Sequence, residues 1–291
     1  MVIHTIKSLL KKGADILKKS AADTPILDSE ILLAYALGCS REKLIIDWEE
    51  QIADSIVRRY LDFIKMRAAG KPVQYITGHQ EFMGLDFFVG EGVLIPRPDT
   101  EITVLKVLEL LKSSKGIPKI ADLCTGSGAI GVSLSYYIED SFIYAVDISK
   151  VALEYCENNA INNNVLDKMK ILNGDLAKPL FVEGLAGELD VLVSNPPYIS
   201  KREMAELPGS VRYYEPHLAL FGGEIGLDFY EKILKDAPIL LKKDGILIFE
   251  IGYNQGEAIK RMIEKTGCFT DINIEKDLAG LDRCVFCYLK E

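Results

Sequence analysis

The tetrapeptide Asn195-Pro-Pro-Tyr198 directly follows residues 189–194, an apolar run that is typical of a buried parallel strand. Its two prolines fix φ at about −65° and remove two N–H donors, so the chain leaves the strand in a stiff, extended conformation. Rigid carbonyls beside an asparagine oxygen and a tyrosine ring can accept both hydrogens of a planar NH2 group and stack on its plane. Such acceptors would draw the nitrogen toward tetrahedral geometry and direct its lone pair at an electrophile. By itself, the tetrapeptide is equally consistent with a proline-rich turn.

A second motif lies in residues 120–130, where an apolar strand runs into a glycine turn and then a helix. Gly126 and Gly128 let the backbone turn tightly and approach a ligand closely. Asp122, at the strand end, is predicted to accept a hydrogen bond from a ligand ammonium group. The Cys124-x-Gly126-x-Gly128 spacing is tighter than the GxGxxG of dinucleotide enzymes. A nicotinamide-dependent oxidoreductase would also leave the Asn-Pro-Pro-Tyr segment without a role.

Two further acidic residues follow the next strands. Asp147 ends the strand after the glycine turn and is placed to bond ribose hydroxyls, and Asp175 is suited to an adenine amino group. Ligands of open α/β sheets bind at the carboxyl ends of the strands. The glycine turn, Asp147, Asp175 and the Asn-Pro-Pro-Tyr segment end four successive strands, which indicates a nucleotide-like site. The glycine turn resembles the S-adenosyl-L-methionine (AdoMet) site of Rossmann-like methyltransferases.

Charge and composition restrict the class of partner. The chain has 291 residues, 48% hydrophobic and 26% charged, as is ordinary for a globular protein. Residues 1–80 carry a net charge of +2 (12 Lys/Arg, 10 Asp/Glu), and residues 81–291 carry −11 (22 and 33). The acidic part lacks the basic footprint of a duplex-binding protein, so we expect no stable nucleic-acid partner.

Other classes are excluded by local patterns. The first residues lack the unbroken apolar core of a secretion signal, and no early apolar run is long enough for a membrane span. A cytoplasmic location with reduced thiols is therefore expected. Cys284 and Cys287 form one CxxC within a strand-like run, where residues three apart face opposite sides and cannot share a metal. We predict no metal site.

The elements fall into three stretches. Residues 1–70 predict a helical bundle, with Thr24-Pro25 at a helix start and Gly38 at its end. Residues 71–98 contain short β-like runs, beginning with 73–76, between glycines, and predict a hairpin linker. Residues 99–291 alternate helix and strand, which predicts an α/β domain with a largely parallel sheet. The seven expected strands are 119–123, 142–146, 169–172, 191–194, 246–250, 271–274 and 284–289.

Over nearly its whole length the chain resembles the release factor glutamine methyltransferases, the HemK/PrmC group. The segments that carry this resemblance are Gly70–Gly78, Val93-Leu-Ile-Pro-Arg-Pro-Asp-Thr-Glu101, the glycine turn, Ser194–Ile199, Tyr214-Glu-Pro216, Ala219–Gly223 and Glu250-Ile-Gly252. Residues 93–101 are the most specific of these, since the Asn-Pro-Pro-Tyr segment also occurs in DNA adenine and rRNA guanine methyltransferases. One departure is Cys124, where the family usually has glycine.

The resemblance implies a Rossmann-like fold and AdoMet-dependent N5-methylation of the glutamine in the Gly-Gly-Gln motif of class I release factors, with S-adenosyl-L-homocysteine as product. The N-terminal helices would help to dock the release factor. The catalytic residues would be Asn195, Pro196 and Tyr198, and the substrate site would add Pro197; Arg97 is added as a candidate for closing the pocket entrance. The cofactor would contact Cys124, Thr125, Gly126, Ser127, Gly128, Asp147, Leu176 and Asn195, with Asp122 and Asp175 added from their places at strand ends.

Three questions stay open at this level. Arg97 and Glu101 either close the pocket entrance or form a structural ion pair. A nucleic-acid amino methyltransferase, acting on adenine N6 or guanine N2, is the alternative function. A non-catalytic docking protein that retains the shape of an AdoMet site is a third possibility.

Overall fold

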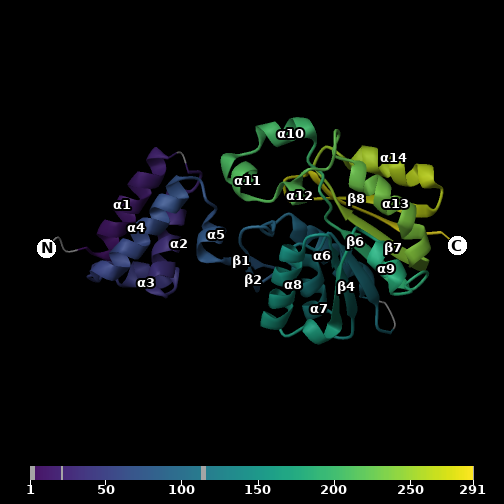
Figure 1. The fold of residues 1–291 in the computed structure, drawn as a ribbon, viewed down its shortest axis with the longest axis horizontal. Coiled ribbons are helices and arrows are strands. Elements are labelled where there is room, and N and C mark those ends of the chain that lie inside the picture. The colour runs from purple at the N-terminus through teal and green to yellow at the C-terminus, as the bar shows by residue number, and fades with distance from the viewer. Residues whose placement is uncertain (1–3, 21, 113–115, 291) are drawn as a thin grey trace. The chain divides into compact units, whose positions relative to one another are not determined.

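The computed structural model describes residues 4–20, 22–112 and 116–290 (Figure 1). The chain forms two compact units. The helical unit comprises residues 1–79 together with Pro208–Tyr214, and the α/β unit comprises Gln80–Leu207 and Glu215–Glu291. A short segment from the middle of the chain thus belongs to the N-terminal unit.

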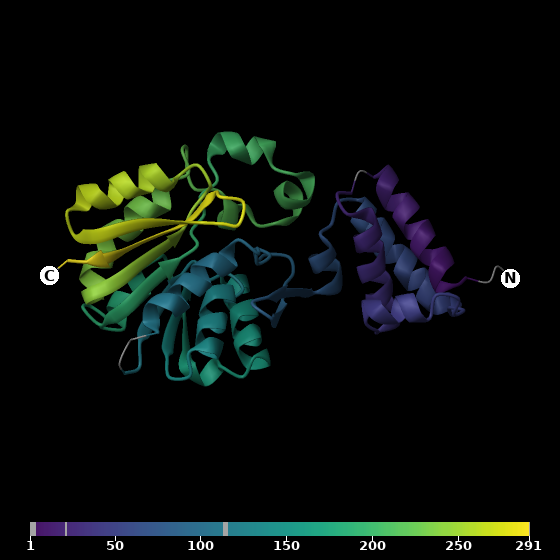
Figure 2. The ribbon, with the colours of Figure 1, turned by 180° about the vertical axis from the view of Figure 1, so that it is seen from behind.

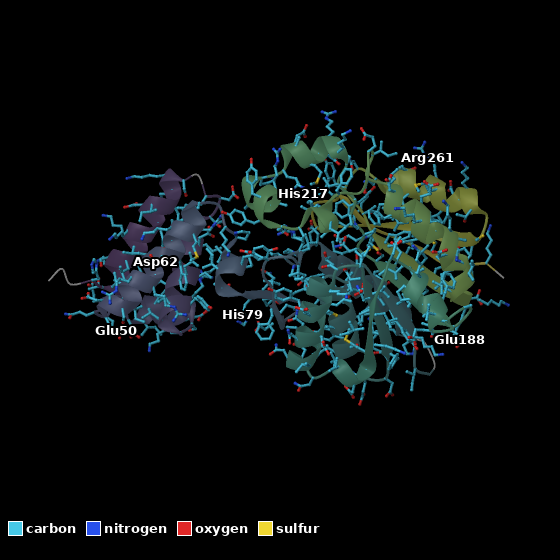
Figure 3. All side chains as sticks on the ribbon, in the orientation of Figure 1. Glu50, Asp62, His79, Glu188, His217 and Arg261 are labelled. Atoms are coloured by element: carbon cyan, nitrogen blue, oxygen red, sulfur yellow. The ribbon has the colours of Figure 1, made fainter. Side chains whose placement is uncertain are left out.

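The helical unit forms because its helices are amphipathic and well delimited. Pro25 occupies the first turn of a helix that ends at Gly38 in the left-handed conformation (φ 66°), as the sequence predicts. Large apolar side chains fill the centre, while Glu50 and Asp62 lie exposed at the surface (Figure 3). The helices are α1 (Ile6–Lys19), α2 (Pro25–Leu37), α3 (Arg41–Ile46), α4 (Asp54–Ala68), α5 (Val73–Thr77) and α11 (Gly209–Tyr214).

One prediction in this region is wrong. Residues 73–76 form helix α5, not a β-like run. Pro72 precedes the helix and Gly78 ends it in the left-handed conformation (φ 82°), so these residues delimit a single helical turn. A short apolar run cannot by itself distinguish strand from helix. The predicted hairpin does follow, as β1 (His79–Phe82) and β2 (Leu85–Phe88).

The α/β unit is built on a seven-stranded, largely parallel sheet, as expected from the sequence, and the order of its strands is β5-β4-β3-β6-β7-β9-β8. Each neighbouring pair from β5 through β4, β3 and β6 to β7 is parallel, and β9 is antiparallel to both of its neighbours, β7 and β8. The strands are β3 (Lys119–Leu123), β4 (Phe142–Asp147), β5 (Met169–Asn173), β6 (Leu189–Ser194), β7 (Leu241–Glu250), β8 (Phe269–Lys276) and β9 (Asp282–Leu289).

Helices cover both faces of this sheet, which explains why the central strands are apolar throughout (Figures 1 and 2). Val193 packs into the core on one face and Leu192 into the core on the other. One face carries α6 (Thr100–Leu111), α7 (Ala129–Tyr137) and α8 (Lys150–Asn162); the other carries α9 (Lys178–Val182), α13 (Asp228–Leu240) and α14 (Gly256–Thr266). The remaining short helices are η1 (Leu166–Lys168), α10 (Lys201–Glu206) and α12 (His217–Leu220).

The orientation of the two cysteines in β9 agrees with the sequence. Cys284 and Cys287 are buried in the cores on opposite faces of the sheet, as alternation along β9 requires. Within the described ranges, no group of three or more His, Cys, Asp or Glu side chains is arranged to hold a metal ion. No described helix combines the length and apolarity that crossing a bilayer demands.

Candidate active site

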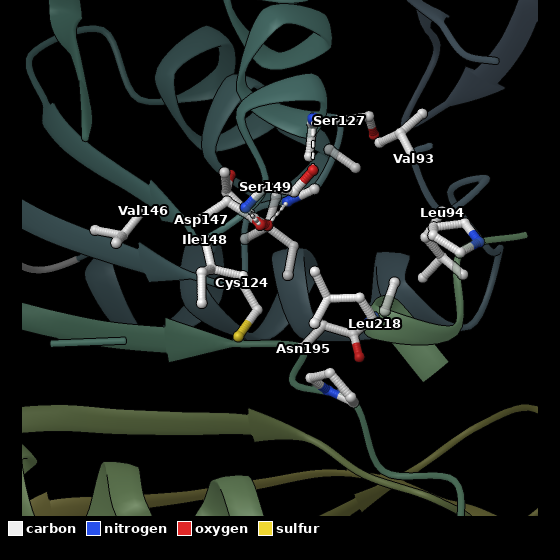
Figure 4. A pocket seen from close by; sticks show the side chains of 18 of the residues that line it. Val93, Leu94, Cys124, Ser127, Val146, Asp147, Ile148, Ser149, Asn195 and Leu218 are labelled. Carbon is white, nitrogen blue, oxygen red and sulfur yellow. Dashed lines mark hydrogen bonds between the residues drawn. The ribbon is translucent and has the colours of Figure 1, made fainter. Parts of the chain in front are cut away.

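A cavity of about 320 Å³ opens at the carboxyl ends of β3, β4, β5 and β6 (Figure 4). Its size falls in the range of small-molecule sites, and its place is where open parallel sheets bind ligands. Ten residues predicted for the cofactor or substrate line it: Arg97, Cys124, Thr125, Gly126, Ser127, Asp147, Asp175, Leu176, Asn195 and Pro197. Patterns far apart in the sequence thus meet in one place.

Asp147 is held at the end of β4 by backbone donors. Its Oδ2 accepts a hydrogen bond from the Gly126 N–H at 2.9 Å, and its Oδ1 accepts one from the Ser149 N–H at 2.9 Å. Burial raises the pKa of this carboxyl, and backbone donors at Ser149, Gly126 and Ile148 oppose that shift. The carboxylate lines the cavity and can only accept hydrogen bonds, which suits a ligand with hydroxyl groups.

The glycine turn leaves room for a ligand at its apex. Gly126 has φ 57°, and a Cβ added there would meet no atom within 4 Å, although the residue lines the cavity. Cys124 and Leu176 also line the cavity and also adopt positive φ, 59° and 51°. Such conformations are costly for residues other than glycine and concentrate at functional sites. The usual glycine of the family at position 124 is therefore explained by its backbone conformation.

Two residues predicted to contact the cofactor do not reach the cavity. Asp122 is fully buried beneath the turn, where its Oδ2 accepts hydrogen bonds from Thr125 Oγ1 (2.6 Å) and the Gly131 N–H (3.0 Å). Burial raises its pKa to about 7. Gly128 begins α7 against Cys156, whose Sγ would lie 2.8 Å from an added Cβ. Both residues hold the turn in shape, and neither lines the cavity.

Asn195 lies at the floor of the cavity, beside Cys124 (Figure 4). The preceding residue, Ser194, donates from Oγ to the Leu123 carbonyl at 2.7 Å and ties β6 to β3. The Asn195 amide donates from Nδ2 to Thr100 Oγ1 at 3.4 Å. Thr100 belongs to segment 93–101, so this segment contacts Asn195 directly.

Segment 219–226 packs closely against the rest of the tetrapeptide. An added Cβ at Gly222 would lie 2.6 Å from the Pro197 carbonyl oxygen, and one at Gly226 would lie 2.2 Å from the Tyr198 carbonyl oxygen. Gln255 Nε2 donates to that Tyr198 oxygen at 3.0 Å. Pro196 and Tyr198 do not line the cavity themselves; both belong to the closely packed tetrapeptide that positions Asn195. The glycines are required because two backbones approach closely.

Arg97 also finds a different partner from the one considered from the sequence. It forms an ion pair with Glu215, whose other oxygen accepts a hydrogen bond from the Ile95 N–H at 3.3 Å. Glu101 instead accepts from the Met83 N–H at 2.8 Å. The Glu215 side chain is buried, and that of Arg97 is 37% exposed. The pairing of Arg97 with Glu101 is therefore wrong, and Arg97 is held at the cavity by Glu215.

Several lining residues were not predicted. Thr100 and Pro216 lie within segments that carry the family resemblance but received no role, and Ile148 and Ser149 directly follow Asp147. Phe229 and Lys232 on α13 have no local signal in the sequence, because a helix far along the chain places them there. The other lining residues without a predicted role are Gly92, Val93, Leu94, Pro96, Ala129, Ile130, Val146, Ala152, Gly174, Leu218 and Ala219.

Solved structures agree with this architecture. A methyltransferase from Pyrococcus furiosus superposes with a TM-score of 0.51 at 19% identity and covers 72% of this chain and 91% of that one. The N-terminal domain of human METTL16 in complex with SAH superposes with a TM-score of 0.52 at 17% identity, covering 82% and 84%. At these identities the likeness concerns the fold alone, which is that of Rossmann-like methyltransferases.

Sequence relatives are more specific. Residues 8–78 match the PrmC N-terminal domain and residues 103–207 the methyltransferase small domain. The release factor glutamine methyltransferase of Moorella thermoacetica is 42% identical over 287 residues, 99% of each chain. Those of Clostridium acetobutylicum (42%, covering 96% of this chain and 97% of the relative) and Bacillus subtilis (39%, 97% of each) are similarly close. The chain therefore belongs to the release factor glutamine methyltransferase family.

Proposed function

We propose that this protein transfers a methyl group from AdoMet to the side-chain amide nitrogen, N5, of the glutamine in the Gly-Gly-Gln motif of class I release factors. The observation that carries the proposal is a single cavity that brings Asn195, at the Asn-Pro-Pro-Tyr strand end, together with the glycine turn and Asp147. The first element suits a planar amide and the other two suit a nucleoside. Family membership agrees with this combination.

The described residues fit AdoMet. Asp147 would accept from the ribose hydroxyls, and Gly126 leaves open space at the turn. Ile148 and Leu176 offer apolar surface for the adenine, with the Asp175 carboxylate beside them. Asp175 is ion-paired with Lys178 at 2.7 Å and retains acceptor positions for an amino group. When bound, AdoMet supplies an electrophilic methyl group on a sulfonium.

The chain's own residues would then prepare the nucleophile. Asn195 Oδ1, which lines the cavity, would accept one hydrogen of the substrate amide. Pro196 and Tyr198 do not line the cavity themselves, so the Pro196 carbonyl would accept the second hydrogen, and the Tyr198 ring would stack on the amide plane, where the substrate meets the tetrapeptide at the cavity edge formed by Asn195 and Pro197. Because the prolines and the close packing against Gly222 hold this segment rigid, the acceptors are preorganised and need not rearrange during the reaction. The nitrogen would form its bond to the methyl carbon as the bond from that carbon to sulfur breaks, and the cationic amide would then lose one proton to water, so the proposal needs no separate base.

The helical unit is proposed to dock the release factor. A folded protein must present one glutamine to a narrow pocket, and contacts remote from the pocket supply that orientation. Predicted boundaries place docking in residues 1–70, a linker in 71–98 and catalysis in 99–291. A class I release factor as partner and a cytoplasmic location remain part of the proposal.

The decisive test incubates the protein with methyl-labelled AdoMet and a purified class I release factor, followed by mass-spectrometric mapping of the labelled peptide. We expect one methyl group on the glutamine side-chain nitrogen of Gly-Gly-Gln. The matched control is a release factor in which this glutamine is replaced by alanine, which should take up no label. A DNA duplex and an RNA hairpin are assayed in parallel. Methylation of nucleic-acid amino groups, with none on the release factor, would overturn the proposal in favour of the alternative function.

A further inference from the structure

A buried carboxyl group lies next to the reaction centre without a role in the steps above. Glu250 ends β7, and the β6–β7 register pairs Ser194 with Phe249, so Asn195 and Glu250 follow side by side at the same sheet edge. Glu250 is 2% exposed, and its Oε2 has no hydrogen-bond partner among the described residues. A buried acidic group without full compensation costs free energy, and such groups concentrate at functional sites.

The surroundings leave the charge of Glu250 adjustable. Burial raises the pKa of this carboxyl to about 7; the side chains of Thr100 and Asn195, which can donate to it, and the charge of Arg283 lower the pKa, while Asp99 raises it. Arg283 already pairs with Asp99 at 3.1 Å and Asp277 at 2.9 Å, so its charge is largely compensated. The other titratable groups that interact with Glu250 are Tyr198, Tyr230 and Cys284.

The orientation of the Asn195 amide needs a group of this kind. The two ends of an amide have the same shape and differ only in hydrogen bonding, because the oxygen accepts and the nitrogen donates. Thr100 Oγ1 contacts Asn195 Nδ2 at 3.4 Å, but a hydroxyl can donate or accept and so permits either orientation. An ionised carboxylate can only accept, and therefore selects the orientation with Nδ2 toward itself.

We propose that ionised Glu250 is a positioning residue that holds the Asn195 amide with Nδ2 inward and Oδ1 directed at the substrate amide. This inference rests on the proposed function, since it assigns Oδ1 as an acceptor for the glutamine NH2 group. Glu250 does not touch the substrate; it acts through Asn195, with Thr100 as the third member of the cluster.

Protonation would reverse this selection. A protonated carboxyl donates through its O–H, and that hydrogen would favour Asn195 Oδ1 turned inward, away from the substrate. Turnover should therefore fall as the pH decreases through about 7, whereas cofactor affinity, which depends on the other strand ends, should change little. The acid limb of kcat is the signature of the positioning role.

The test compares the full-length wild type with Glu250→Gln and Glu250→Asp from pH 5.5 to 9, measuring kcat and KM on the release factor and the AdoMet dissociation constant by calorimetry. Glutamine has nearly the same shape but can present either a donor or an acceptor to Asn195. We expect Glu250→Gln to lose roughly 10- to 100-fold in kcat at pH 8, to lose the acid limb near pH 7, and to keep AdoMet affinity within about threefold. Glu250→Asp should retain an acid limb and an intermediate kcat.

Asp122→Asn is the matched control, because Asp122 is the other buried carboxyl whose pKa is raised to about 7. It should keep the acid limb. A Glu250→Gln variant with wild-type kcat and an unchanged acid limb would overturn the inference, as would a loss of AdoMet affinity as large as the loss of kcat. In both cases a wild type that methylates the release factor leaves the proposed function intact. A wild type that leaves the release factor unmethylated would overturn the function and this inference together.

Discussion

Asn195 is the residue on which the chemistry most depends, because its amide oxygen is one of two acceptors proposed to hold the substrate nitrogen. Asn195→Ala should reduce kcat by about 10²–10³, or roughly 2.7–4 kcal/mol, the usual effect of removing one preorganised partner of a reacting group. AdoMet affinity should fall much less, since the ends of β3, β4 and β5 are proposed to supply most of the cofactor contacts. Single-turnover rates and calorimetry separate the two effects. Turnover close to that of the wild type would show that Asn195 does not orient the nucleophile.

Asp147 is proposed to bind the cofactor. Asp147→Ala should raise the AdoMet dissociation constant, because charge-assisted hydrogen bonds to hydroxyls contribute about 1.5–3 kcal/mol each. Turnover should largely recover at saturating AdoMet. The side chain also accepts from the Gly126 and Ser149 N–H groups, so Asp147→Asn, which keeps one acceptor oxygen, is the milder comparison and should lie between wild type and alanine. Unchanged affinity by calorimetry would assign Asp147 a structural role only.

Cys124 tests the backbone conformation of the turn. At φ 59° the left-handed conformation costs a non-glycine residue roughly 1–2 kcal/mol. Cys124→Gly should therefore retain or increase the free energy of unfolding and keep AdoMet affinity. Cys124→Val should lose at least about 1 kcal/mol of stability and bind AdoMet more weakly, because a β-branched side chain is stiff and would project into the cavity. Urea unfolding with and without AdoMet measures both. A valine variant as stable as the wild type contradicts the argument.

At the scale of elements, the site depends on how segment 219–226 packs against the end of β6. In Gly222→Ala the new Cβ would lie 2.6 Å from the Pro197 oxygen and 2.7 Å from the Tyr198 Cα, so the tetrapeptide must move. We expect kcat to fall more than AdoMet affinity, because displaced acceptors no longer match the substrate amide.

Gly209→Ala is the matched control for this displacement. An added Cβ at Gly209 would meet only Tyr213 carbons at 3.6 Å, an ordinary contact, and the residue lies in helix α11. Because α11 belongs to the helical unit proposed to dock the substrate, a change at Gly209 would act on KM, so kcat at saturating release factor should distinguish the two variants. Equal kinetics for Gly222→Ala and Gly209→Ala would show that the close approach at Gly222 does not position the site.

At the scale of the whole molecule, the cavity lies entirely within the α/β unit, so cofactor binding and docking should be separable. A variant that starts near Lys71 should bind AdoMet with unchanged affinity, lose most activity on an intact release factor, and keep its weak activity on a short Gly-Gly-Gln peptide. The variant also loses partners of segment 208–214, such as the Ala69 carbonyl, which accepts from Tyr214 Oη at 3.0 Å.

Circular dichroism and light scattering should accompany these assays, because the truncation exposes segment 208–214. Full activity of a soluble, folded truncation on the intact release factor would remove the docking role. A truncated protein that is insoluble or does not bind AdoMet would show instead that residues 1–70 are needed to complete the fold.

The sequence alone determined the order of elements, the parallel sheet and most of the cavity. Apolar runs ended by Asp147, Asp175 or Asn195 are local patterns, and the carboxyl ends of parallel strands necessarily meet at one edge. It also determined that Cys284 and Cys287 face apart, since alternation is a local property of a strand.

Only the tertiary structure decided which side chains pair across the fold. Arg97 meets Glu215, 118 residues away, and not nearby Glu101. Gly222 packs against Pro197. The Asp122 side chain is buried beneath the glycine turn, where it accepts from Thr125 Oγ1, and does not line the cavity. Glu250 lies beside Asn195 because β7 is the neighbour of β6 in the sheet. Such pairings depend on strand order and on close packing between distant segments, and periodicity along the chain carries no information about either.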